Sequence, residues 1–108
     1  MFFNKEPKYY KDILIKADET LHKQVANIIN TLNTKDKNLL DFGAGEGAFS
    51  QRMLDSGYKV IAVDIDKANF KANTDFHKID INSLSIDDEF ISKYNNFFDI
   101  VVSLEVIE

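Results

Sequence analysis

The run LLDFGAGEGAFS at residues 39–50 constrains this chain more than any other segment. Its three glycines, Gly43, Gly45 and Gly47, lie between two apolar stretches, and Asp41 precedes them. Glycine loses more backbone freedom on ordering than any other residue, so three of them this close together need a reason beyond a tight turn. We expect a strand, a turn and a helix, with a ligand close to the backbone of the turn.

The rest of the chain alternates between strand patterns and helix patterns. Apolar runs predict strands at residues 39–43, 59–64, 76–80 and 97–104. Helical spacing predicts helices at residues 17–33, 46–56, 66–73 and 85–94, with Gly57 and Asp66 as caps. Strands that alternate with helices pair in parallel through right-handed crossovers. The pattern therefore predicts an α/β, Rossmann-like, doubly wound parallel sheet with its first four strands in the order 3-2-1-4, preceded by an N-terminal helix.

Two parts of the chain are distinguished by these patterns: an N-terminal arm and helix at residues 1–36, and the sheet region at residues 37–108. His22 falls on the polar side of the first helix, where we expect it to be solvated. Tyr9 and Tyr10 are expected either to pack as a simple arm or to form part of a lid over the ligand. The predicted apolar face of the first helix consists of Leu21, Val25, Ile28, Ile29 and Leu32.

Composition and charge exclude several classes of protein. A chain of 108 residues forms one domain at most, and its 44% hydrophobic and 29% charged residues are ordinary for a soluble globular protein. It has no cysteine, which rules out disulfides and thiolate metal sites and fits a cytoplasmic location. The net charge of −5 gives no reason to expect a nucleic-acid partner. No apolar run predicts a membrane span, and no His, Asp or Glu spacing predicts a metal site.

A dinucleotide fingerprint is one interpretation of the glycine run. Gly43, Gly45 and Ala48 match G-x-G-x-x-G/A, and Asp64 lies 21 residues after Gly43, where a ribose-binding acid belongs. Two details favour another ligand. Asp41, inside the strand, suits a cationic group better than a pyrophosphate, and a third glycine opens more room than the fingerprint requires.

Four segments resemble one family in their order and spacing. They are D-x-G-x-G-x-G at residues 41–47, the acid that closes KVIAVD, FHKIDI at residues 76–81, and FFDIVVSLEVIE at residues 97–108. Together they resemble the class I S-adenosylmethionine-dependent methyltransferases of the small-molecule type, from about residue 37 to Glu108. A complete domain of that family has seven strands, so the resemblance implies that the chain is the N-terminal, cofactor-binding part of a longer domain.

The resemblance also assigns roles in binding S-adenosyl-L-methionine. Asp41 holds the ammonium side of the cofactor, and the turn Gly43, Ala44, Gly45 and Gly47 passes under its methionine and ribose. Asp64 accepts hydrogen bonds from both ribose hydroxyls, because a carboxylate with two oxygens suits a vicinal diol. The remaining assignments are Ile65 and Ile81 on the two faces of the adenine, Asp80 on its amino group, and the backbone of Leu104 near the methionine end.

The implied reaction is methyl transfer to a small-molecule, lipid-like or glycan acceptor. The lack of cysteine argues against cytosine C5 methylation, and the segment SLEV lacks the pattern of exocyclic-amine DNA methylation. Neither a catalytic base nor the acceptor is identified. Residues 1–108 alone are expected to bind the cofactor poorly and to self-associate through the exposed edge of the fourth strand. The alternatives are an NAD(P)-binding oxidoreductase domain and a non-catalytic S-adenosylmethionine-binding module.

Overall fold

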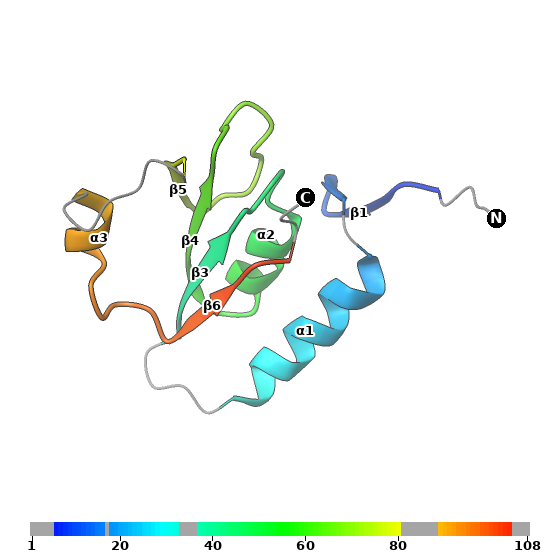
Figure 1. The fold of residues 1–108 in the computed structure, drawn as a ribbon. Coiled ribbons are helices and arrows are strands. Elements are labelled where there is room, and N and C mark those ends of the chain that lie inside the picture. Colours follow the sequence, from blue (N-terminus) through cyan, green and yellow to red (C-terminus); the bar gives the residue numbers. More distant parts are fainter. Residues whose placement is uncertain (1–5, 17, 33–36, 81–88, 105–108) are drawn as a thin grey trace.

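The computed structural model describes residues 6–16, 18–32, 37–80 and 89–104. Its centre is a four-stranded parallel sheet with helices on both faces, and a separate two-stranded hairpin lies near the N-terminus (Figure 1). The prediction of an α/β fold with a parallel sheet is confirmed. The strands lie in the order β5-β4-β3-β6. Their bounds are β3 Asn38–Phe42, β4 Lys59–Asp64, β5 Asp75–Lys78 and β6 Ile100–Val102.

The central strands are the ones with the strongest sequence pattern. In β4, four consecutive residues, 60–63, are buried, as a strand covered on both faces requires. Strand β6 is shorter than the predicted span of 97–104. Pairing starts only where Asp99 docks on Asn38, with Asp99 N donating to Asn38 O at 2.9 Å and Asn38 N donating to Asp99 Oδ2 at 2.9 Å. Phe97 and Phe98, which precede that point, pack against each other and Tyr94 instead.

Helix α1, Glu19–Thr31, begins at Asp18, whose carboxylate accepts a hydrogen bond from Thr20 N at 2.9 Å. Its buried residues are His22, Ala26 and Ile29. The prediction that His22 is solvated is wrong: the side chain is fully buried, with its ring edge-on to Phe49 at 5.4 Å between centroids. The contact face is rotated from the predicted one, because the amphipathic imidazole packs inward while Ile28 is 61% exposed.

Helix α2, Ala48–Asp55, buries Phe49 and Met53 as the sequence predicts. It begins two residues later than predicted, because Gly47 adopts a left-handed conformation at φ +96° and cannot continue a helix. At the other end, Gly57 has a φ of +98° and donates its N–H back to the last turn, as predicted for a C-cap.

The segment at residues 66–73 does not form the predicted helix. Asp66 Oδ1 accepts from Ala68 N at 2.9 Å, so the predicted cap closes only a single turn. Beyond that turn, backbone N–H groups bond to the glycine turn and to α2 rather than to their own segment, so tertiary contacts override helix propensity. Helix α3, Glu89–Lys93, lies within the last predicted helix, of which residues 85–88 fall outside the described residues.

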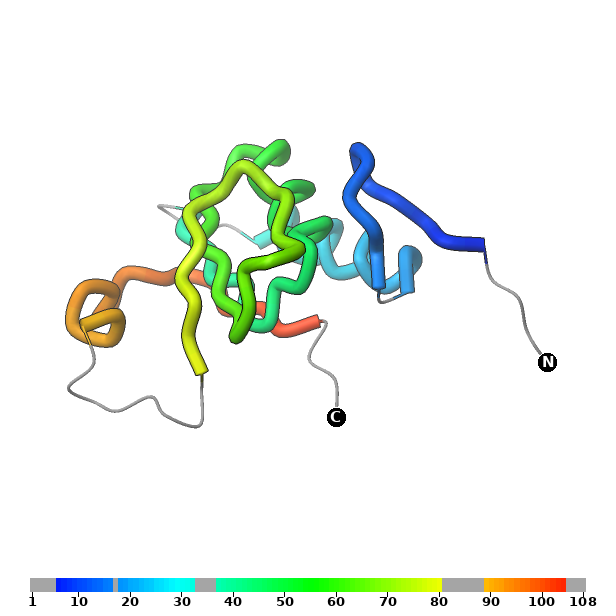
Figure 2. The backbone as a smooth tube through the Cα atoms, turned by 90° about the horizontal axis from the view of Figure 1, so that it is seen from above, coloured from blue at the N-terminus to red at the C-terminus, as the bar shows by residue number. Residues whose placement is uncertain are grey.

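An antiparallel hairpin precedes the helices. Strands β1, Lys8–Tyr10, and β2, Ile13–Ile15, are joined by two residues with positive φ, Lys11 and Asp12. Positive φ at both central positions is the geometry of the two-residue turn that suits the twist of a hairpin. Strands of three residues leave too short a pattern to be recognised in the sequence. The hairpin packs beside α2 and close to the glycine turn (Figure 2).

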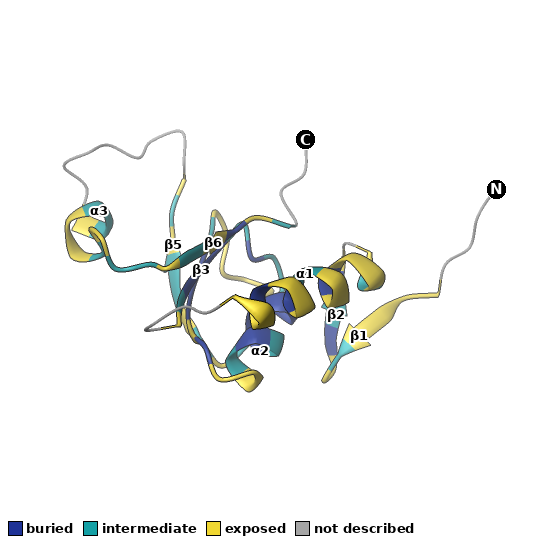
Figure 3. Cartoon of the chain, turned by 90° about the horizontal axis from the view of Figure 1, so that it is seen from below, coloured by how far each residue is buried: buried dark blue, intermediate teal, exposed yellow. Residues whose placement is uncertain are grey.

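Two apolar clusters cover the two faces of the sheet, and Figure 3 shows buried positions in β3 and in α2. On one face, α1 and α2 cover Leu39, Val60 and Val102. On the other face, Leu40, Ile61 and Val63 pack against aromatic residues of α3 and the segment after it, which are Phe90, Tyr94, Phe97 and Phe98. None of the helices in the described part of the chain is long and apolar enough to cross a bilayer.

Candidate functional site

The glycine turn joins β3 to α2 at the carboxyl edge of the sheet. Gly43, Gly45 and Gly47 all have positive φ, at +79°, +62° and +96°, a region that side chains disfavour. Gly43 N and Ala44 N both donate to Val63 O, at 2.8 and 3.0 Å, so the turn crosses directly over the end of β4. The positive φ at these three positions is therefore by itself a sufficient reason for glycine, whether or not a ligand lies close to the turn.

Asp64 lies opposite this turn, at the end of β4. Its Oδ2 accepts from Gly45 N at 2.7 Å, and its Oδ1 accepts from Ile65 N at 2.6 Å. The structure thus brings together the glycine turn and the acid that the sequence assigned to the ribose. Ile65, assigned to the adenine face, follows immediately and is 56% exposed, which is unusual for an isoleucine beside a buried strand.

Asp41 is placed beneath the turn and is only 2% exposed. Ser50 Oγ, in the first turn of α2, donates to Asp41 Oδ2 at 2.6 Å. The carboxylate is therefore directed toward α2, and not into the open edge of the sheet as expected. Sequence reasoning missed Ser50, whose polar side chain is fully buried; its position on the inner side of α2, beside Phe49, was the available signal.

The other predicted residues are distributed around the same edge. Ile79 N donates to Asp64 O at 2.9 Å, which ties the end of β5 to the end of β4 and leaves Asp80 exposed one residue further on. Leu104, two residues beyond β6, is half-buried against the α1–α2 cluster. Ile81 lies outside the described residues. Asp41, the turn, Asp64, Ile65 and Asp80 thus share the carboxyl edge of adjacent strands.

The space beside Gly47 is already filled. A Cβ atom at this position would lie 2.8 Å from Ala72 Cβ and 2.8 Å from Phe70 Cε1. The idea that the third glycine opens room for a ligand is therefore wrong: it allows the loop after β4 to cross the turn. The same loop is held by Lys71 N, which donates to Glu46 O at 2.8 Å.

Glu46, between the last two glycines, was also missed. Its carboxylate is 12% exposed and lies between two lysines, 3.5 Å from Lys71 Nζ and 4.0 Å from Lys16 Nζ. Lys16 follows the hairpin and Lys71 belongs to the loop after β4. Glu46 therefore links both neighbouring segments to the turn.

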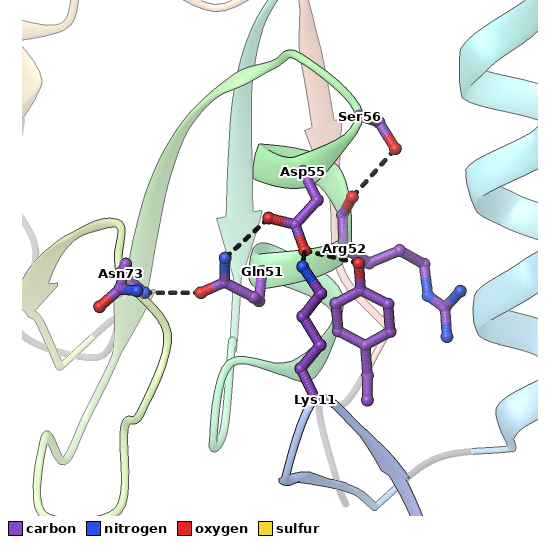
Figure 4. Close-up of polar contacts among 7 residues, drawn as sticks. Lys11, Gln51, Arg52, Asp55, Ser56 and Asn73 are labelled. Carbon is purple, nitrogen blue, oxygen red and sulfur yellow. Dashed lines mark hydrogen bonds and ion pairs between the residues drawn. The ribbon is translucent and has the colours of Figure 1, made fainter.

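Asp55, at the end of α2, anchors the hairpin (Figure 4). Tyr10 OH donates to Asp55 Oδ2 at 2.6 Å, and Lys11 Nζ lies 2.8 Å from the same oxygen. Hydrogen bonds from Lys11 and then Tyr10 hold the pKa of Asp55 down to about 2, and burial together with the Asp55 hydrogen bond raises the pKa of Tyr10. The guanidinium of Arg52 stacks on the Tyr10 ring at 4.4 Å. Tyr10 therefore packs as part of a docked arm, the first of the two expected roles.

A pocket of about 460 Å³ lies between the hairpin, α2 and the loop after β4. Its lining is polar and carries both signs of charge, from Lys11, Asp12, Asp55 and Lys71. Across residues 6–16, 18–32, 37–80 and 89–104, no three His, Asp or Glu side chains gather to hold a metal ion.

Comparison with known protein families gives a match over most of the chain. A family model described as a methyltransferase domain matches residues 17–108, all of the chain except the arm and hairpin. No curated protein and no solved structure matches the chain. The matched region contains the residues that the sequence assigned to the site and that the structure describes, whereas the hairpin residues and Lys16 precede it.

Proposed function

The chain belongs to the methyltransferase domain family, and from that premise we propose that it binds S-adenosylmethionine across the carboxyl ends of β3, β4 and β5 and transfers the methyl group of this cofactor. The observation that carries the proposal is the hydrogen bond of 2.7 Å between Gly45 N and Asp64 Oδ2. It holds an acid suited to a ribose against Gly45, which carries no side chain that would keep a ligand away from the backbone.

The geometry of Asp64 fits a ribose in chemical terms. A carboxylate offers about four lone-pair sites, and backbone N–H groups of Gly45 and Ile65 occupy one site on each oxygen. Each oxygen therefore keeps capacity for one more donor, and a vicinal diol presents two donors. The backbone bonds hold the carboxylate in one orientation, which lowers the entropy lost when the diol binds.

The neighbours of Asp64 fit the rest of the nucleoside. The exposed apolar side chain of Ile65 offers a surface for the adenine ring, and its burial by the ring would remove apolar area from water. Asp80 lies at the same edge, exposed and able to accept from the adenine amino group. The methionine end then lies over the turn, above the buried carboxylate of Asp41, whose negative charge favours a cation in this partly dry region.

When bound, S-adenosylmethionine supplies an electrophilic methyl group on a sulfonium. The residues described here orient that group and exclude water from one side of it, which is the contribution expected of a cofactor-binding edge. We further propose a small-molecule, lipid-like or glycan acceptor, on the resemblance of residues 97–108 to the small-molecule members of the family. Its nucleophilic atom and the base that receives its proton are not assigned.

The proposal is tested by titration calorimetry on the intact protein with S-adenosylhomocysteine and with NAD. We expect S-adenosylhomocysteine to bind and NAD not to bind. Asp64→Ala should weaken binding by about 1.5–3 kcal/mol, a factor of about 10 to 150, because hydrogen bonds to a charged acceptor are lost. Asp75→Ala is the matched control, since Asp75 is exposed at the first residue of β5, on the opposite edge of the sheet, and should leave affinity unchanged. Binding of NAD alone, or equal effects of both substitutions, would contradict the proposal.

A further inference from the structure

One buried amide joins the loop after β4 to helix α2. Gln51 is 8% exposed; its Nε2 donates to Asp55 Oδ1 at 3.0 Å, and its Oε1 accepts from Asn73 N at 2.8 Å (Figure 4). An ionised carboxylate only accepts hydrogen bonds, so Asp55 requires the NH₂ end of the amide. The oxygen end is then left for Asn73. The ionised state of Asp55 thereby fixes the orientation of Gln51.

The hairpin sets the state of Asp55 from the other side. Tyr10 OH and Lys11 Nζ both approach Asp55 Oδ2, while Gln51 uses Oδ1. With a pKa of about 2, Asp55 stays ionised at any physiological pH. A continuous series of polar contacts therefore runs from the hairpin through Asp55 and Gln51 to Asn73.

The loop that ends near Asn73 begins beside Asp64. Within residues 65–74 its short-range bonds lie in the first half, at Ile65 N, Ala68 N and Phe70 N. Its later part is held from outside, by Glu46 O on Lys71 N and by Gln51 on Asn73 N. If the Gln51 contact were removed, the later part of the loop would keep the hydrogen bond from Lys71 N to Glu46 O but lose the one at Asn73 N.

We propose that Gln51 is a positioning residue for the cofactor: it couples the docked hairpin to the loop after β4 and so sets where Asp64 and Ile65 meet the adenosine part of the ligand. The inference rests on the function proposed above. Gln51 itself lies one turn into α2 and touches neither of those residues in the contacts described. A loosened loop has to be ordered when the nucleoside binds, and that ordering lowers affinity.

The first test is Gln51→Met, which keeps the length of the side chain and removes both hydrogen bonds. The dissociation constant of S-adenosylhomocysteine should rise about 3- to 10-fold, the range expected for one net hydrogen bond. Gln24→Met is the matched control, because Gln24 is an exposed glutamine on α1, and it should leave affinity unchanged. Hydrogen exchange at the Asn73 amide should accelerate in Gln51→Met and not in the control.

The second test separates positioning from general stability by a pH profile. In Gln51→Glu, a neutral acid can donate its O–H to Asp55 and accept from Asn73, whereas an ionised Glu can only accept. The titratable groups that surround position 51 are Asp55 on α2, three residues of the hairpin, and Lys71 on the loop; the hairpin residues are Tyr10, Lys11 and Asp12. Burial and the Asp55 carboxylate, which contacts position 51 directly, raise the pKa of the introduced acid, whereas the opposing charges of Lys11 and Lys71 are already paired with Asp55 and Glu46. Affinity of this variant should therefore recover toward that of the unsubstituted protein between about pH 8 and about pH 5.

The outcomes are distinguishable. If the unsubstituted protein does not bind S-adenosylhomocysteine, the proposed function fails and this inference fails with it. If it binds, but Gln51→Met binds equally well, or Gln51→Glu has the same pH profile as the unsubstituted protein, only the role of Gln51 is overturned. Should Gln51→Met not fold, the profile of Gln51→Glu decides between the two results.

Discussion

Replacing Gly47 by alanine separates steric crowding from backbone strain. A Cβ atom at Gly47 would lie 2.8 Å from both Ala72 Cβ and Phe70 Cε1, and 3.2 Å from Ala72 N. Phe70 cannot easily turn aside, because its ring packs on Phe76 at 4.7 Å between centroids. The left-handed backbone adds strain of about 1–2 kcal/mol for any L side chain, and overpacking adds about 1–3 kcal/mol. We expect Gly47→Ala to lower the free energy of unfolding by about 2–5 kcal/mol.

Gly57 provides the matched control. Its φ of +98° is almost that of Gly47, but an added Cβ would meet nothing within 4 Å. Gly57→Ala should therefore cost only the backbone term of about 1–2 kcal/mol. Urea denaturation of both variants measures the difference, which should be about 1–3 kcal/mol in favour of Gly57→Ala. Equal losses in the two variants would show that the loop after β4 does not crowd Gly47.

Two further predictions concern polar contacts of α2. Ser50→Ala removes the buried donor to Asp41 and should lower the free energy of unfolding by about 1–3 kcal/mol. Ser56→Ala, which removes an exposed hydroxyl, should have a smaller effect. Thermal denaturation compares the two variants, and equal effects would argue against the Asp41 contact. Asp55 has a pKa lowered from 3.8 to about 2, so its contribution to stability is complete above about pH 4 and is lost as the pH falls toward 2. Asp55→Asn should flatten this acid limb of the stability profile, and an unchanged limb would show that the hairpin contact contributes nothing.

The parts of the fold that could be predicted are those specified by local pattern. The apolar run of β4 is long enough to require a buried strand. The glycines after β3 predict a turn, and all three have the positive φ that favours glycine. Gly57 could be predicted as a C-cap, because a glycine directly after a helical pattern commonly ends the helix in a left-handed conformation. Asp64 was predictable as the acid that closes β4, and its carboxylate contacts the turn through Gly45 N, whereas Ile65 was assigned by the resemblance alone.

The remaining features depend on contacts between segments distant in sequence. Nothing local shows that Asn73 N bonds to Gln51 instead of continuing a helix. The inward direction of His22 depends on the ring of Phe49, 27 residues away in the sequence. Gln51 and Asp55 look like an ordinary solvated helix face until the hairpin is placed on them. Sequence patterns predicted the strands of the sheet and its two longer helices, but not the short hairpin or the polar side chains that join the elements.

A crystal structure of the intact protein with S-adenosylhomocysteine tests the central claim most directly. We expect both ribose hydroxyl oxygens to lie within about 2.5–3.0 Å of the Asp64 carboxylate oxygens, in the range of charge-assisted O–H···O bonds. We also expect the adenine ring to lie against Ile65 and the amino acid end over the turn at residues 43–47. A nucleoside bound elsewhere, or a ribose that leaves Asp64 bonded only to Gly45 and Ile65, would contradict the account.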